Sequence, residues 1–101
     1  MIYISGPISG DRSYKIKFKA AQEQLEARGY SVVNPAELDR VIPAHQMSQE
    51  DIMTTCLDLL RQCDAIVLLP GWEKSLGCQR ERGYAEGSDL IVLRLEDFLE
   101  T

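Results

Sequence analysis

Glu81 is the residue whose setting most strongly suggests chemistry. It lies in the run SLGCQRERGYA, residues 75–85, a predicted helix that follows a strongly apolar segment. Gly77, Glu81 and Ala85 are four residues apart, so they share one helical face and leave the carboxylate between small neighbours. Ser75 is a good N-cap, and the missing side chain at Gly77 lets a ligand approach the first N–H groups of the helix. A solvated glutamate on a helix packed through Gly and Ala is the alternative that these residues leave open.

A second candidate is the loop GPISGDRS at residues 6–13, which follows the first apolar run of the chain. In an open α/β sheet, ligands bind in the crevice outside the carboxyl ends of parallel strands. The Gly, Ser and Pro content of this loop fits that role, although a plain strand-to-helix connection has the same composition. We expect this loop and Glu81 to face one crevice.

These groups need a framework, and the hydrophobic pattern predicts strands that alternate with helices. Short buried strands are expected at residues 2–5, 30–33, 65–69 and 90–93. Helices are expected from Tyr14 to about Gly29, from the N-cap Ser48 to about Gln62, and from Ser75 onward. Residues 36–47 are predicted to form a loop with one helical turn, and residues 95–100 a last turn.

This alternation predicts the α/β class, with right-handed crossovers and helices on both faces of a parallel sheet. We expect a single domain over residues 1–101, a flavodoxin- or Rossmann-like three-layer sandwich. The four-stranded parallel sheet is predicted in the order 2-1-3-4, with its switch point between the first and third strands. That order brings the loop after Ser5, the loop after Leu69 and Glu81 to one place.

Composition excludes several classes of function. The 45% hydrophobic and 27% charged content is ordinary for a globular protein, and no apolar run approaches the roughly 20 residues of a membrane span. Because the start of the chain lacks a basic n-region, we predict a cytoplasmic protein without a cleaved signal or a membrane partner. The formal charge of −5 argues against a nucleic-acid polymer as partner.

The cysteines and the histidine do not predict a metal site. Cys56, Cys63 and Cys78 have no CxxC spacing, so neither a disulfide framework nor zinc is indicated, and Cys56 and Cys63 fit small core positions. His45 stands alone in IPAHQM and is interpreted as a loop residue. We expect no metal and no cofactor.

Three motifs in chain order resemble one known family. YISGPISG from Tyr3, CDAIVLLPGWEKS from Cys63, and SLGxxxExGxA from Ser75 to Ala85 are similar to the nucleoside 2-deoxyribosyltransferase-like family. The closest likeness is to its small, often phage-associated members and to the 2′-deoxynucleoside 5′-phosphate N-glycosidases. The resemblance covers nearly the whole chain.

This resemblance implies cleavage of the bond between a nucleobase and C1′ of a ribose or deoxyribose, by hydrolysis or by transfer to a second base. In the family a glutamate attacks C1′ to form a covalent glycosyl-enzyme, and Glu81 matches that position. Tyr3 matches a tyrosine that positions the nucleophile, and Ser75 with Gly77 match the group that holds the 5′-hydroxyl or 5′-phosphate. The residues expected to bind substrate are Ser5, Gly6, Pro7, Ser9, Gly10, Asn34, Cys56, Ser75 and Gly77.

The chain departs from the family pattern where the leaving base is protonated. The family's acidic aspartate lies eight residues before the residue that matches Asp64, which is the position of Cys56 here. A thiol, with a reference pKa of about 8.5, is a poor replacement for a carboxylic acid. Asp51, or else Glu50, is then predicted to act as the acid; slow turnover, and nucleotide binding without cleavage, are the other outcomes left open.

Three smaller predictions concern ligand contacts. Ser9 stands where monophosphate hydrolases of the family can carry arginine. Arg12 is therefore the candidate to bind the 5′-phosphate in place of that arginine. Asn34 is predicted either to hydrogen-bond base or sugar or to form an Asn-Pro turn. Trp72 either stacks on a base or covers a subunit contact.

Three functions therefore remain open, in decreasing order of weight: an N-glycosidase or deoxyribosyltransferase with Glu81 as nucleophile, a catalytically impaired nucleotide-binding or regulatory module, and a protein-interaction scaffold. The expected small-molecule partner is a nucleoside or nucleotide. The resemblance and the small size of the domain also predict a homo-oligomer, a dimer or larger.

Overall fold

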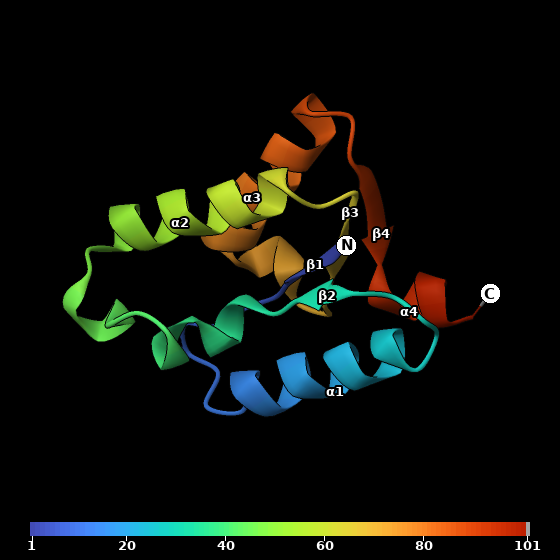
Figure 1. Ribbon diagram of the computed structural model, residues 1–101, viewed down its shortest axis with the longest axis horizontal. Helices are drawn as coiled ribbons and strands as arrows, with labels where there is room; N and C mark the ends of the chain where they lie inside the picture. Colours follow the sequence, from blue (N-terminus) through green and yellow to red (C-terminus); the bar gives the residue numbers. More distant parts are fainter. Residues whose placement is uncertain (101) are drawn as a thin grey trace.

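The chain folds around a four-stranded parallel sheet (Figure 1). The computed structural model describes residues 1–100 of the 101. Its strands are β1 Ile2–Ser5, β2 Val32–Val33, β3 Ala65–Leu68 and β4 Ile91–Arg94. They lie in the order β2-β1-β3-β4, and each neighbouring pair is parallel. The predicted α/β class, strand order and switch point between β1 and β3 are confirmed.

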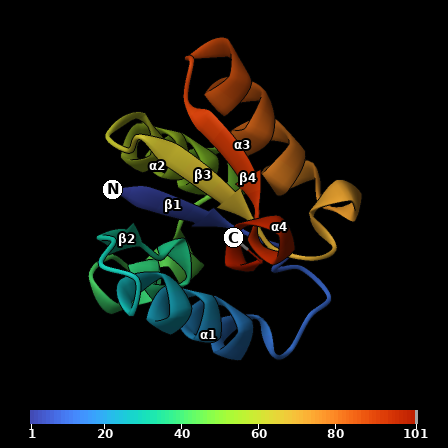
Figure 2. The same ribbon diagram turned by 90° about the vertical axis from the view of Figure 1, so that its right-hand side faces the viewer.

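Helices cover both faces of the sheet, which completes the predicted three-layer sandwich. Figure 2 shows α1 on one face, with α2 and α3 together on the other. The α-helices are α1 Tyr14–Glu26, α2 Gln49–Arg61, α3 Leu76–Gly87 and α4 Leu95–Leu99. Three short 3-10 helices join these elements: η1 Pro35–Arg40, η2 Ala44–Gln46 and η3 Trp72–Lys74.

Each face of the sheet has its own core because strand side chains alternate between the two faces. Ile2 and Ile4 of β1 pack in an apolar cluster with Phe18 and Leu25 of α1. Tyr3 points to the opposite face and packs in a second cluster with residues of α2, β3 and α3. The first core is therefore built against α1, and the second positions α2 and α3.

Serine caps set the start of α2 and α3, as predicted. The Ser48 hydroxyl accepts a hydrogen bond from the Asp51 N–H at 3.0 Å, and the Ser75 hydroxyl accepts one from the Cys78 N–H at 3.3 Å. Each cap pairs an N–H group that the first helical turn would leave without a partner. The Ser75 cap places the start of α3 at the carboxyl end of the sheet, where β3 has just ended.

The predictions from the sequence were less accurate at the two edge strands and in the segment 36–47. The predicted strand at 30–33 is reduced to Val32–Val33, because Tyr30 turns toward α4 and packs edge-on against Phe98. The fourth strand begins one residue later than predicted, since the Leu90 N–H donates to the Ala85 carbonyl at the end of α3. The segment 36–47, predicted to be mostly loop, contains η1 and η2.

Within residues 1–100, none of the helices combines the length and the apolar character needed to cross a bilayer.

Candidate active site

Glu81 is a buried carboxylate at the switch point of the sheet. It lies on α3 with 7% of its surface exposed, so the alternative of a solvated surface glutamate is excluded. The Tyr3 hydroxyl donates a short hydrogen bond to Glu81 Oε2, and the Ser5 hydroxyl donates one to Oε1 at 2.7 Å. Both donors come from β1, so the strand and the helix are joined through this carboxylate.

The surroundings of Glu81 shift its proton affinity in two opposing ways. Burial raises the pKa of the Glu81 carboxyl above its usual range, because a charged group loses its hydration. The hydrogen bonds from Tyr3 and Ser5 oppose part of that rise, since they stabilise the charged form. Burial and the neighbouring Glu81 charge also raise the pKa of the Tyr3 phenol, so Tyr3 stays protonated as a donor.

Glu81 faces a cavity of about 420 Å³. The walls come from β1 and the loop after it, from α1, η1 and η2, and from α2 and α3. This volume lies within the range of roughly 300–1,000 Å³ typical of small-molecule sites. The cavity opens at the carboxyl end of β1, where ligands bind in open parallel sheets.

The loop after β1 contributes to the cavity only in part. Gly6 and Ser9 line it, whereas Pro7 and Gly10 do not. Gly6 is required by packing, because a Cβ there would lie 2.8 Å from Leu69 Cδ1. Gly10 has a φ of 80°, in the left-handed region that favours glycine, so it shapes the loop. Pro7 packs near Gly71 instead.

The start of α3 forms another part of the wall. Ser75, Gly77 and Cys78 all line the cavity, and the substrate contacts expected of the first two stay a prediction. A Cβ at Gly77 would meet Met53 Cε only at 3.4 Å, so packing does not demand glycine there. Space for a ligand group beside the first helical turn is the consequence of this small residue. Ser5, in contrast, reaches the site only through its bond to Glu81 and does not line the cavity.

Cys56 and Asp51 occupy different positions on α2. Cys56 is buried, lines the cavity beside Tyr3, and packs in the second core. Burial raises the pKa of its thiol, and the Tyr3 hydroxyl offsets part of that rise. Asp51 is exposed in the first turn of α2, and neither Asp51 nor Glu50 lines the cavity. The structure therefore does not bring Asp51 together with Glu81, and its acid role stays a prediction.

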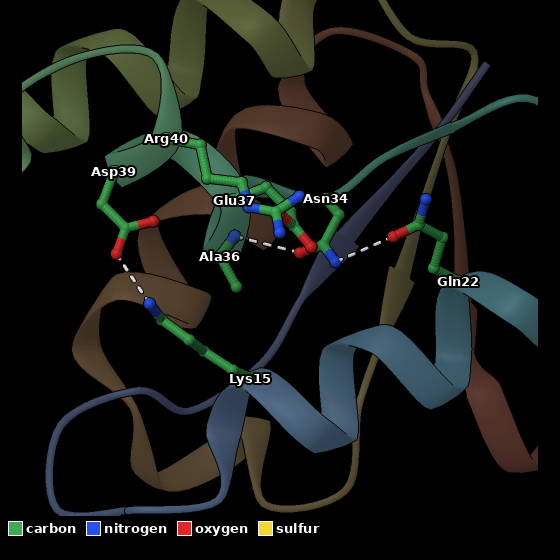
Figure 3. A network of polar contacts seen from close by, with 7 residues as sticks. All are labelled: Lys15, Gln22, Asn34, Ala36, Glu37, Asp39 and Arg40. Carbon is green, nitrogen blue, oxygen red and sulfur yellow. Dashed lines mark hydrogen bonds and ion pairs between the residues drawn. The ribbon is translucent and has the colours of Figure 1, made fainter.

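Asn34 has a structural use outside the cavity lining (Figure 3). Its side-chain oxygen accepts a hydrogen bond from the Ala36 N–H at 3.0 Å, which caps η1. Its amide nitrogen donates to Gln22 Oε1 on α1, also at 3.0 Å. Asn34 thus fixes the start of η1 against α1, which favours the turn alternative over a ligand contact.

Two further expected ligand contacts lie away from the cavity. Trp72 is half-buried, with the Arg82 guanidinium 5.1 Å from the centre of its ring, so this face of the indole stacks on a cation of the same chain. Arg12 is exposed in the loop before α1 and does not line the cavity.

His45 is a cavity residue that the sequence did not reveal. It was expected to be only a loop residue, yet it lies in η2 and lines the same cavity as Glu81. Its isolation in the sequence left no spacing signal that could place it there. Asp39 and Gln49 line the cavity as well. Among residues 1–100, no group of three or more His, Cys, Asp or Glu side chains is placed to hold a metal.

Fold and site together define an α/β protein with a hydrogen-bonded, buried carboxylate facing a small-molecule cavity at the switch point of its sheet. Residues 1–94 match the model of a family described as a domain of unknown function, DUF4406. The chain is 30% identical to a protein of Thermofilum pendens named "Putative 2′-deoxynucleoside 5′-phosphate N-hydrolase 1", over 99% of this chain and 71% of that protein. No solved structure matches the chain. The chain belongs to the DUF4406 family and, with this relative, to the nucleoside 2-deoxyribosyltransferase-like family.

Proposed function

We propose that this protein cleaves the N-glycosidic bond of a nucleoside or nucleoside monophosphate, with Glu81 as the nucleophile. The observation that carries the proposal is the Glu81 carboxylate, buried, bonded by Tyr3 and Ser5, and facing a cavity of about 420 Å³. The Thermofilum pendens relative bears the name "Putative 2′-deoxynucleoside 5′-phosphate N-hydrolase 1", which supports the same reaction class.

The first step forms a covalent glycosyl ester. An oxygen of the ionised Glu81 attacks C1′, the C1′–N bond breaks, and its electron pair leaves with the base. The transition state resembles an oxocarbenium ion, so a carboxylate beside C1′ also stabilises its positive charge. Water then attacks C1′ of the ester in hydrolysis, or a second base does so in transfer.

Tyr3 and Ser5 prepare the nucleophile. Each hydroxyl donates to one carboxylate oxygen, which fixes the plane of the carboxylate and favours its charged form in a buried site. Preorganised donors of this kind need no rearrangement during the reaction. Ser75 and Gly77, beside the first turn of α3, are proposed to accommodate the 5′ end of the substrate.

A nucleotide-binding module without turnover is the second candidate. One observation favours it: Cys56 lines the cavity, and burial raises the pKa of this thiol, which makes it a weak proton donor. This candidate predicts binding of nucleotides without release of free base, and it predicts that Cys56→Asp creates activity.

Release of free base separates the two candidates. The parent protein and Glu81→Gln are incubated with the four deoxynucleoside 5′-monophosphates and the four deoxynucleosides, and free base is measured by chromatography. We expect base from the parent and a loss of roughly 10⁴-fold or more in the variant, as for other nucleophile substitutions. Intact substrate in every parent reaction would contradict the proposed function.

Stability measurements test whether this loss of activity is chemical or structural. Burial disfavours the charged form of Glu81, so the parent loses stability as pH rises through the raised pKa of this carboxyl. Glutamine cannot ionise and still accepts from Tyr3. Glu81→Gln is therefore expected to melt at the same temperature as the parent or higher at pH 7.5, and the gap should close at acidic pH. A variant that melts well below the parent at pH 7.5 would indicate structural damage instead.

The oligomeric state stays a prediction. We expect a homo-oligomer from the family and from the small size of the domain. Light scattering on the purified protein would test this.

A further inference from the structure

His45 is placed at the outer part of the cavity that Glu81 faces from inside. It is the single histidine of the chain, and its side chain is exposed, whereas Glu81 is buried at the end of β1. Both residues line the same space. With C1′ at Glu81 and the 5′ end beside Ser75 and Gly77, as the proposed function has them, the remaining part of the cavity is available to the base. His45 lines this cavity too, so the inference below places the base between the carboxylate and His45.

The proposed reaction needs a proton at that base. When the C1′–N bond breaks, its electron pair stays on the base, and a proton donated there makes the base a better leaving group. A positioned donor contributes roughly 10²- to 10⁴-fold to such a step.

The acidic groups of the wall other than Glu81 are unsuited to this task. Asp39 forms an ion pair with Lys15 at 2.6 Å, and this contact lowers the pKa of its carboxyl, so Asp39 has no proton to give near neutral pH. Burial raises the pKa of the Cys56 and Cys78 thiols, and a neutral thiol is a weak hydrogen-bond donor.

The two phenols of the cavity wall are also unsuited to protonate the base. Tyr3 already donates its proton to Glu81 Oε2, and burial together with the Glu81 charge raises the pKa of this phenol. Tyr14 packs edge-on against Phe18, and a phenol is a much weaker acid than an imidazolium. Histidine, in contrast, is the side chain that ordinarily exchanges a proton between pH 5 and 8.

The 3-10 helix η1, which precedes the turn that carries His45, is anchored to α1, as Figure 3 shows. Lys15 pairs with Asp39, and Asn34 joins Gln22 to the first turn of η1. The backbone continues in turns from η1 to η2, with the Ile42 N–H bonded to the Leu38 carbonyl at 3.0 Å and the Ala44 N–H to the Ile42 carbonyl at 2.8 Å. His45 therefore lies in a hydrogen-bonded turn that continues from the anchored η1.

We propose that His45 is the catalytic acid that protonates the leaving base. As Glu81 attacks C1′, the His45 imidazolium gives its proton to the base, so the base departs neutral and His45 becomes a neutral imidazole. When water attacks C1′ of the glycosyl ester, the ester bond to Glu81 breaks, Glu81 regains its charge, and His45 takes the proton that the water loses. The imidazolium is restored, and protons balance over the cycle. This inference rests on the proposed function.

A pair of substrates tests this role. In 2′-deoxyguanosine 5′-monophosphate the base needs a proton to leave well, whereas the N7-methylated counterpart carries a cationic base that departs neutral without one. Kinetics with both substrates are measured for the parent, for His45→Gln, and for Val41→Ala, an exposed position between η1 and η2 outside the cavity lining. For His45→Gln we expect kcat/KM to fall roughly 10²-fold or more with the ordinary nucleotide and less than about threefold with the methylated one. Val41→Ala should match the parent on both.

Other outcomes overturn the proposal. Equal losses on the two substrates would make His45 a binding or structural residue, and no loss on either would remove it from the mechanism. If Asp51→Asn, instead of His45→Gln, lowers kcat/KM with the ordinary nucleotide but not with the methylated one, then Asp51 is the acid. Failure of the proposed function itself looks different, because the parent then releases no base from either nucleotide.

Discussion

Both faces of the sheet carry a buried hydrophobic cluster, but only one of them also buries polar groups. The face covered by α1 buries aliphatic and aromatic side chains, among them Ile2, Ile4 and Leu25. The other face, which α2 and α3 cover in Figure 2, holds Ser5 and Glu81, the two buried polar residues among residues 1–100. One four-residue strand, β1, supplies both faces.

The difference shows how a domain of this size separates stability from function. Because the side chains of β1 alternate, Ile2 and Ile4 anchor the strand to α1, while Tyr3 and Ser5 are presented to Glu81 on the other side. A buried carboxylate costs stability, since its charge loses hydration. Burial of Ile2 and Ile4 against α1 stabilises the same strand that carries the donors Tyr3 and Ser5, and so offsets that cost.

The largest effect on stability is expected on the apolar face. Leu25→Ala removes a fully buried side chain of α1 and should lower the free energy of unfolding by about 2–5 kcal/mol, measured in urea. Leu76→Ala, at a position 77% exposed, should change it by less than about 0.5 kcal/mol. A loss of less than about 1 kcal/mol for Leu25→Ala would contradict the inference that the face covered by α1 provides the stability.

Tyr3→Phe is expected to act on activity more than on stability. In the parent, the hydrogen bond from Tyr3 lowers the pKa of the Glu81 carboxyl. The variant lacks this donor, so the pKa of Glu81 rises further. We expect a loss of roughly 10²-fold in kcat/KM near neutral pH and an acid limb of the pH profile moved to higher pH. Tyr30→Phe, at an exposed tyrosine, is the control and should leave the profile unmoved. An acid limb that stays in place for Tyr3→Phe would separate Tyr3 from the nucleophile.

Gly77→Ala should give the smallest effect and sharpen the contrast within one helix. Alanine favours the helix by up to roughly 1 kcal/mol, and its methyl group has only ordinary contacts with the protein, but it enters the cavity. We expect unchanged or higher stability and a several-fold higher KM. Gly83→Ala on the same helix has open space around its Cβ and should gain stability without a change in KM. Equal KM values in the two variants would place the ligand away from α3.

The fold was predictable from local signals because those signals agreed. Alternation of apolar runs with helical periodicity predicted the parallel sheet and its order, and Ser48 and Ser75 marked the helix starts correctly. One error arose where a distant contact decided the local structure, and the others concerned a strand end and two short 3-10 helices. Tyr30 was assigned to a strand but packs against Phe98, a residue near the other end of the chain.

The site was predictable only where strand ends and motifs pointed to it. The pairing of Tyr3 and Glu81, 78 residues apart, was expected from the resemblance and from the strand order. Asn34 and Asp51, by contrast, were chosen for being near the crevice, and neither side chain lines the cavity. Proximity along the chain does not say which way a side chain points at the end of an element.

By itself, the amino-acid sequence determined the main strands and helices and the helical face that Gly77, Glu81 and Ala85 share, because periodicity and capping act over a few residues, and their alternation predicted the strand order. Only the tertiary structure decided that the carboxylate accepts from both Tyr3 and Ser5, and that η1 and η2 bring His45 to the same cavity. The physical reason is range: these contacts join residues far apart in the chain, and they exist only after the sheet and its helices have packed.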